Sequence, residues 1–92
     1  MPELSDLQPY LDDEGRLKLL PRQPSLRRLA LAFLVTEFEF GRDYTEREVN
    51  DLLRTLHTFD DPALLRREMF EAGLLNRDKN GARYWRATAK FL

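Results

Sequence analysis

The chain has 92 residues, a formal net charge of −1 and no cysteine, and 42% of its residues are hydrophobic. This length predicts one small domain spanning residues 1–92, and the lack of cysteine excludes disulfides, thiolate metal sites and cysteine nucleophiles. No apolar run reaches the length of a membrane span, and the first residues, MPELSDL, are acidic where a signal peptide would be basic, so the sequence predicts a cytoplasmic protein that does not enter the membrane.

Residues 1–24 are predicted to form an irregular segment that leads into the first helix. The stretch LQPYLDDEGRLKLLP contains a helical turn, a turn at Glu14–Gly15 and a short extended run that ends at Pro21. Proline and glycine interrupt regular structure at these points, so no long helix or strand is expected here.

Residues 25–40 are predicted to form the first helix. Six apolar residues recur at the i, i+3, i+4, i+7 spacing of one helix face: Leu26, Leu29, Ala30, Phe33, Leu34 and Phe38. Leu31 and Val35 widen this face, which indicates a well-buried helix. Gly41 is the expected stop, because glycine adopts the left-handed conformation that commonly ends a helix.

Residues 45–57 are predicted to form the second helix, which has the clearest start signal in the chain. Thr45 is followed three residues later by Glu48, the spacing of a capping box in which each side chain satisfies a backbone N–H. A cap of this kind contributes about 1 kcal/mol of stability. The apolar stripe of this helix consists of Val49, Leu52, Leu53 and Leu56.

Residues 61–72 are predicted to form the third helix, capped by Asp60 or Asp61. Pro62 stands at the first helical position, where its missing N–H costs nothing, and Gly73 is the expected stop. The region that follows, residues 74–87, holds two short runs around the dipeptide Asn80–Gly81, which is a strong hairpin signal. Centring the turn there places Arg77 opposite Tyr84 and Asp78 opposite Arg83.

This order of elements predicts an α+β, mainly α fold of the winged helix-turn-helix type. It would consist of a short N-terminal extended segment, three helices and a C-terminal β-hairpin, the wing. In this architecture the second helix supports the third, and one face of the third helix can enter the major groove of DNA.

Several short runs resemble a small bacterial family, domain of unknown function two-zero-eight-seven. They are Tyr44-Thr45-Glu46, Glu48-Val49-Asn50, Leu65-Arg66-Arg67-Glu68, Gly73-Leu74-Leu75, Arg77 and Tyr84-Trp85-Arg86. The resemblance covers roughly residues 15–87, and Pro62 and Met69 depart from the family's usual pattern. Members occur alone or attached to helix-turn-helix regulators, so the resemblance implies a role related to transcription and supplies no known activity.

The cations of the second part of the chain are the candidate DNA contacts. Residues 1–60 hold 8 Lys/Arg and 12 Asp/Glu, whereas residues 61–92 hold 7 and 4, so the balances are −4 and +3 and sum to −1. The candidates lie on the third helix and the hairpin: Arg66, Arg67, Arg77, Lys79, Arg83 and Arg86. Guanidinium groups bind phosphates and guanine edges. The alternative for Arg66 and Arg67 is an ion pair with Glu46 or Glu48, or a solvated surface.

The sequence does not favour catalysis, a cofactor or a metal site. His57 is the only histidine, and it is expected to be a cation that suits the dipole at the end of the second helix. The adjacent carboxylates of Asp12, Asp13 and Glu14 lie on a turn and are expected to be solvated. A nucleophile would need a base and an orienting group, and a metal would need further ligands at workable spacing.

Two functions remain as hypotheses. The first is a DNA-binding bacterial transcription regulator that contacts double-stranded DNA, acting as a homodimer because a single small module gives little specificity. Candidate surfaces for the second copy are the first 20 residues, the flank of the first helix and the tail Ala87–Leu92. The alternative is a protein–protein interaction module that keeps the winged-helix shape without binding DNA, which the acidic first sixty residues favour.

Overall fold

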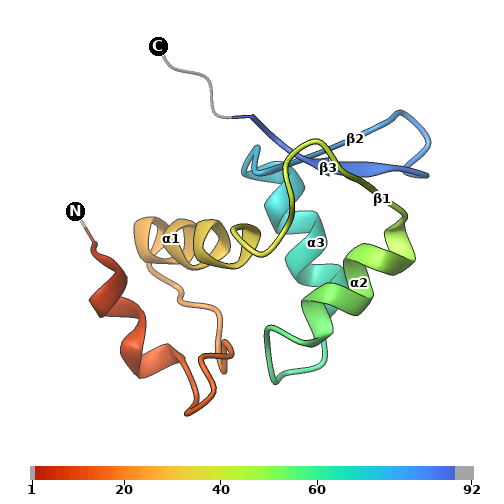
Figure 1. Cartoon of the computed structure of the whole chain (residues 1–92). Coiled ribbons are helices and arrows are strands. Elements are labelled where there is room, and N and C mark those ends of the chain that lie inside the picture. Colours follow the sequence, from red (N-terminus) through yellow and green to blue (C-terminus); the bar gives the residue numbers. More distant parts are fainter. Residues whose placement is uncertain (1, 89–92) are drawn as a thin grey trace.

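A computed structural model describes residues 2–88 of the chain. The fold is α+β and mainly helical, as predicted, and the hairpin follows the last helix as it does in a winged helix (Figure 1). The elements in chain order are the 3-10 helix η1 (Leu4–Tyr10), α1 (Pro24–Val35), β1 (Asp43–Tyr44), α2 (Glu46–Arg54), α3 (Pro62–Glu71), β2 (Leu75–Arg77) and β3 (Tyr84–Arg86). Beyond residue 88, the tail expected to contact a second copy lies outside the described residues. Within residues 2–88, no helix has both the length and the apolar character needed to cross a membrane.

The three strands form one antiparallel sheet in the order β1-β3-β2. The predicted pairing of Arg77 with Tyr84 is confirmed, and the Asp78 N–H donates to the Arg83 carbonyl at 3.0 Å. Strand β1 was not predicted. It lies within the connection between α1 and α2, and a run of two residues carries no readable alternation of polar and apolar residues.

The hairpin turn has the predicted register but another conformation. A two-residue type I′ turn needs a positive φ at both central residues, and here only Gly81 has one, at 73°. The Gly81 N–H donates to the Asp78 carbonyl at 3.1 Å, and the Asn80 side chain accepts a hydrogen bond from the Ala82 N–H at 3.0 Å. The asparagine therefore stabilises the turn through its side chain and stays at negative φ.

Helix α1 starts one residue before the predicted helix and ends at Val35, well before residue 40. Its N-cap is Gln23, whose side chain accepts a hydrogen bond from the Leu26 N–H at 2.7 Å. After the helix the chain turns toward the sheet, where the Phe38 ring meets the Tyr44 ring edge-on at 5.2 Å. Phe38 is therefore buried in the core, as predicted, although it belongs to the turn after α1 and not to the helix itself.

The caps of α2 and α3 follow the sequence signals. Thr45 Oγ1 accepts a hydrogen bond from the Glu48 N–H at 3.0 Å, and Glu48 Oε1 accepts one from the Thr45 N–H at 2.8 Å, which confirms the capping box. Asp61 caps α3 by accepting a hydrogen bond from the Leu64 N–H at 3.2 Å. Helix α2 ends at Arg54, before the predicted residue 57.

The early end of α2 has a cause far away in the sequence. The Leu17 N–H donates to the Leu56 carbonyl at 2.8 Å, and the Thr58 N–H donates to the Leu17 carbonyl at 3.0 Å. The Leu17 side chain is fully buried. The N-terminal segment therefore pairs with the connection between α2 and α3 and holds it extended.

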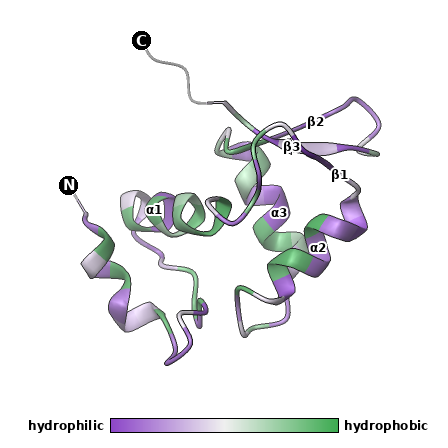
Figure 2. Cartoon of the chain, viewed as in Figure 1, coloured by the Kyte–Doolittle hydropathy of each residue, from purple (hydrophilic) through white to green (hydrophobic). Residues whose placement is uncertain are grey.

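One hydrophobic core lies between the three α-helices and the inner face of the sheet. Figure 2 shows hydrophobic residues (green) on α2 and α3 where these helices meet. Buried side chains from every layer contribute to this core, among them Leu7, Leu17, Leu31, Leu34, Phe38, Val49, Leu53, Leu65, Met69, Leu75 and Tyr84.

Candidate nucleic-acid interface

Helix α3 turns one side to the core and the opposite side to solvent. Pro62, Leu65 and Met69 are buried, and their spacing defines the inner face. Arg67 and Glu71 are exposed and lie one turn apart on the outer face. The two neighbouring arginines of this helix therefore point in different directions, about 100° apart.

Arg66 is a structural residue. Its Nη1 donates to Asn50 Oδ1 on α2 at 2.5 Å, its Nη2 lies 3.9 Å from Glu46 Oε1, and its side chain is 15% exposed. Its guanidinium carbon lies 6.0 Å from the centre of the Tyr84 ring. The guanidinium thus joins α3 to α2 beneath the sheet, as the ion-pair alternative expected.

Arg67 and Arg77 belong to one exposed surface. Phe70 follows Arg67 by three residues and so lies on the same side of α3. The Arg77 guanidinium from strand β2 lies 4.2 Å from the centre of the Phe70 ring. Arg67 and Arg77 are both exposed, and neither pairs with a carboxylate anywhere in residues 2–88.

The tip of the hairpin carries Lys79, which is exposed and also has no ion-pair partner among the described residues. Arg83 is partly neutralised, because its Nη1 lies 3.3 Å from Asp43 Oδ2 on β1. Its guanidinium carbon also lies 5.1 Å from the centre of the Trp85 ring. Trp85 is half-buried on the outer face of the sheet, whereas its neighbour Tyr84 is buried in the core.

Arg86 lies apart from the other candidates. Its Nη1 donates to the Phe38 carbonyl at 3.1 Å, and its guanidinium carbon lies 3.8 Å from the centre of the Phe40 ring. Arg86 is half-buried, whereas Arg67, Arg77 and Lys79 are exposed. Of the six predicted cations, Arg67, Arg77 and Lys79 are exposed and make no ion pair within residues 2–88, and we refer to these three as the open basic surface.

A strong ion pair that the sequence did not predict joins α1 to α3. Arg27 Nε donates to Glu68 Oε1 at 2.7 Å, and Arg27 Nη2 contacts Glu68 Oε2. The hydrogen bonds from Arg27 hold the pKa of Glu68 below its ordinary value. The Arg27 Nη1 also donates to the Pro21 carbonyl at 3.2 Å, so one side chain connects three segments.

His57 is not a surface cation, contrary to the expectation from its place at the helix end. The side chain is 4% exposed. Its Nδ1 lies 2.6 Å from the Leu53 carbonyl oxygen, and its Nε2 accepts a hydrogen bond from the Asp61 N–H at 2.9 Å. A carbonyl can only accept and an N–H can only donate, so the ring is the neutral tautomer with the proton on Nδ1. Both ring nitrogens therefore make hydrogen bonds with the backbone, one with Leu53 in α2 and one with Asp61 at the start of α3.

Comparison with family models of known proteins identifies a family for most of the chain. Residues 16–86 match a family described as an uncharacterized protein conserved in bacteria (DUF2087). No curated protein and no solved structure matches the chain significantly.

Proposed function

We propose that this chain, which belongs to the uncharacterized bacterial family DUF2087, binds double-stranded DNA through the outer face of α3 and the hairpin that follows it. The observation that carries the proposal is the open basic surface formed by Arg67, Arg77 and Lys79. These three cations come from the two elements that contact DNA in a winged helix.

The arrangement of the supporting residues favours a rigid presentation of this surface. Arg66 joins α3 to α2, and the Arg27–Glu68 ion pair joins α3 to α1. The outer face of α3 is thereby fixed by contacts on both of its flanks. A binding face mounted on rigid elements loses little conformational entropy when it docks.

The small number of free cations predicts weak and salt-dependent binding. Three neutralised phosphates correspond to a slope of about −2.7 in a plot of log affinity against log salt, or a loss of about 40-fold between about 50 and 200 mM salt. Phosphate contacts of this kind position a protein without reading sequence. Glu71 on the same face repels phosphate and limits the affinity further.

The test is fluorescence anisotropy with a labelled random-sequence duplex across a salt series. We expect Arg67→Ala to weaken binding several-fold and to reduce the magnitude of the slope to about 1.8. The matched control is Arg22→Ala, which removes an exposed arginine from the connection before α1, across the molecule from the hairpin (Figure 1). It should leave both affinity and slope unchanged. No binding at about 20 mM salt, or equal effects of the two substitutions, would refute the proposal.

Protein binding is the second candidate, and the composition of the α3 face favours it. Leu64 and Phe70 are half-exposed beside Glu71 on this face, a mixture of apolar and acidic groups that suits a protein surface. In a protein interface the two apolar side chains would form the buried centre, and Glu71 would lie on the polar rim. A pull-down that recovers nucleic acid and no protein partner would argue against this candidate.

A further inference from the structure

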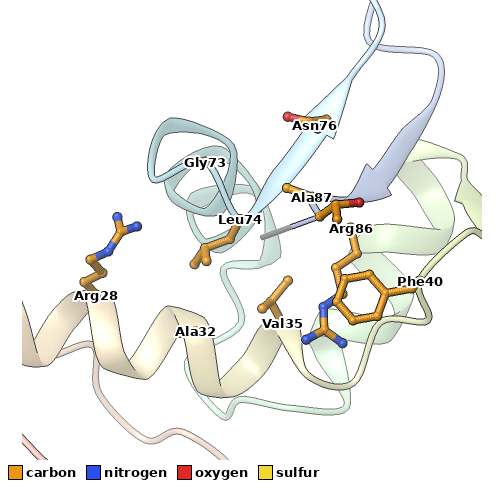
Figure 3. A pocket seen from close by; sticks show the side chains of 10 residues that line it. Arg28, Ala32, Val35, Phe40, Gly73, Leu74, Asn76, Arg86 and Ala87 are labelled. Atoms are coloured by element: carbon orange, nitrogen blue, oxygen red, sulfur yellow. The ribbon is translucent and has the colours of Figure 1, made fainter. Parts of the chain in front are cut away.

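A pocket of about 520 Å³ opens between α1, the turn after α3 and the sheet (Figure 3). It lies on the flank of α1, away from the residues of the open basic surface. Its lining is made of Arg28, Ala32, Val35, Phe40, Gly73, Leu74, Asn76, Arg86, Ala87 and Thr88. A pocket of this size can hold a small organic molecule.

The centre of the pocket is apolar and its two ends are cationic. In Figure 3, Val35 and Leu74 lie between Arg28 at one end and the stacked Phe40 and Arg86 at the other. Phe40 is 58% exposed although it is a large aromatic residue. Aromatic surface left open beside an apolar floor suits a flat apolar ligand.

The electrostatics of the pocket favour an anion. None of the ten lining residues is acidic, although the chain contains 16 Asp and Glu residues. Arg28 Nη1 donates to the Ala72 carbonyl and Arg86 Nη1 to the Phe38 carbonyl, both at 3.1 Å. A guanidinium group has five N–H donors, and each of these two guanidinium groups makes just this one hydrogen bond within residues 2–88.

We propose that this pocket binds a small aromatic carboxylate. The flat ring would lie over Ala32, Val35 and Leu74 and against Phe40, and the carboxylate would accept hydrogen bonds from the guanidinium group of Arg28, which is the more exposed of the two arginines. Charge-assisted hydrogen bonds from arginine to a carboxylate are roughly twice as strong as hydrogen bonds between neutral groups. The site is independent of the proposed DNA binding, because it uses none of the residues of the open basic surface.

The probe is 2-naphthoate, titrated into the full-length ¹⁵N-labelled protein and followed by NMR. We expect amide shifts that cluster at Ala32, Leu74 and Ala87 and saturate with a Kd on the order of 1 mM or tighter. The neutral analogue 2-naphthylmethanol, which has the same ring system, should bind at least about 10-fold more weakly because it lacks the charged acceptor. Absence of saturable shifts, or equal affinity for the two compounds, would overturn the proposal.

Two substitutions with a matched control locate the site. Arg28→Gln changes an exposed residue and should weaken naphthoate about 5-fold or more while leaving naphthylmethanol nearly unchanged. Arg47→Gln makes the same charge change on α2, where the side chain is 92% exposed, and should leave naphthoate binding intact. Equal losses of naphthoate affinity in Arg28→Gln and Arg47→Gln would show that the anion is attracted by the overall charge of the protein, and would refute the site. Ala32→Trp should fill the pocket and abolish binding of both compounds. If that variant does not fold, Arg28→Gln decides.

Discussion

Arg27 and Glu68 lie 41 residues apart in the chain and meet through two charge-assisted hydrogen bonds that join α1 to α3. The side chains are 32% and 22% exposed, so solvent screens the pair only in part. The pair holds the helix whose outer face carries Arg67, and its strength should depend on the ionisation of Glu68.

Glu68→Gln should therefore destabilise the fold at pH 7 and lose its effect in acid. Hydrogen bonds from Arg27 keep the folded-state pKa of Glu68 below the ordinary 4.5, so the contribution of this carboxylate to stability is present above about pH 4.5. It is lost as the pH falls through the lower folded-state pKa. We expect a loss of about 1–2 kcal/mol at pH 7, measured by urea unfolding from pH 7 to pH 3.

The control for this prediction is Glu71→Gln on the exposed side of the same helix. Glu71 makes no ion pair with any residue between 2 and 88, so the wild-type and variant stabilities should stay parallel across the pH series. A constant difference between wild type and Glu68→Gln down to pH 3 would show that the ion pair is not responsible.

Substitutions of the two neighbouring arginines should separate stability from binding. Arg66→Ala leaves Asn50 without its hydrogen-bond donor and removes the cover of Tyr84, so we expect a loss of about 1–2 kcal/mol in the free energy of unfolding. Arg67→Ala should change that free energy by less than about 0.5 kcal/mol. Chemical denaturation of both variants checks the assignment, and equal destabilisation would contradict it.

His57→Phe should destabilise the turn between α2 and α3. The substitution keeps a ring in the buried site but leaves the Asp61 N–H without its acceptor and removes one of the two hydrogen bonds to the Leu53 carbonyl, which also accepts from the Leu56 N–H; an unsatisfied buried N–H costs about 1–3 kcal/mol. The neighbouring Thr58→Ala changes an exposed side chain and should have little effect. An unaltered urea midpoint in His57→Phe would mean that water replaces both hydrogen bonds.

The capping box of α2 should behave as a coupled pair. Thr45→Ala and Glu48→Ala should each lower the free energy of unfolding by about 0.5–2 kcal/mol. The double variant should lose less than the sum, because each single change already breaks the reciprocal arrangement. Thr45→Ser keeps the hydroxyl acceptor and serves as the control. Strict additivity would show that the two hydrogen bonds form independently.

Features set by local chemistry could be predicted from the sequence. The helix starts at Thr45 and Asp61 and the hairpin register around Asn80–Gly81 depend on residues within a few positions of one another. The caps and the turn form between those same neighbours in the folded chain. Local signals of this kind are independent of how the helices pack.

Features set by packing could not be predicted in the same way. Nothing near Arg27 in the sequence points to Glu68, and nothing in the pair Arg66–Arg67 tells which guanidinium faces α2. The pocket beside Phe40 combines residues from four separate segments of the chain. The direction of each side chain follows from the orientation of α3 against its neighbours, which one sequence does not specify.

The pairing of Leu17 with the connection between α2 and α3 determines where the chain can be shortened. A fragment beginning at Pro24, where the first long helix starts, would expose the Leu56 carbonyl and the Thr58 N–H and leave an empty hole in the core where Leu17 sits. Leucine removal from a core of this kind costs about 2–5 kcal/mol, a large part of what holds a small domain together. Truncated versions for crystallisation or fusion should therefore be cut upstream of this leucine.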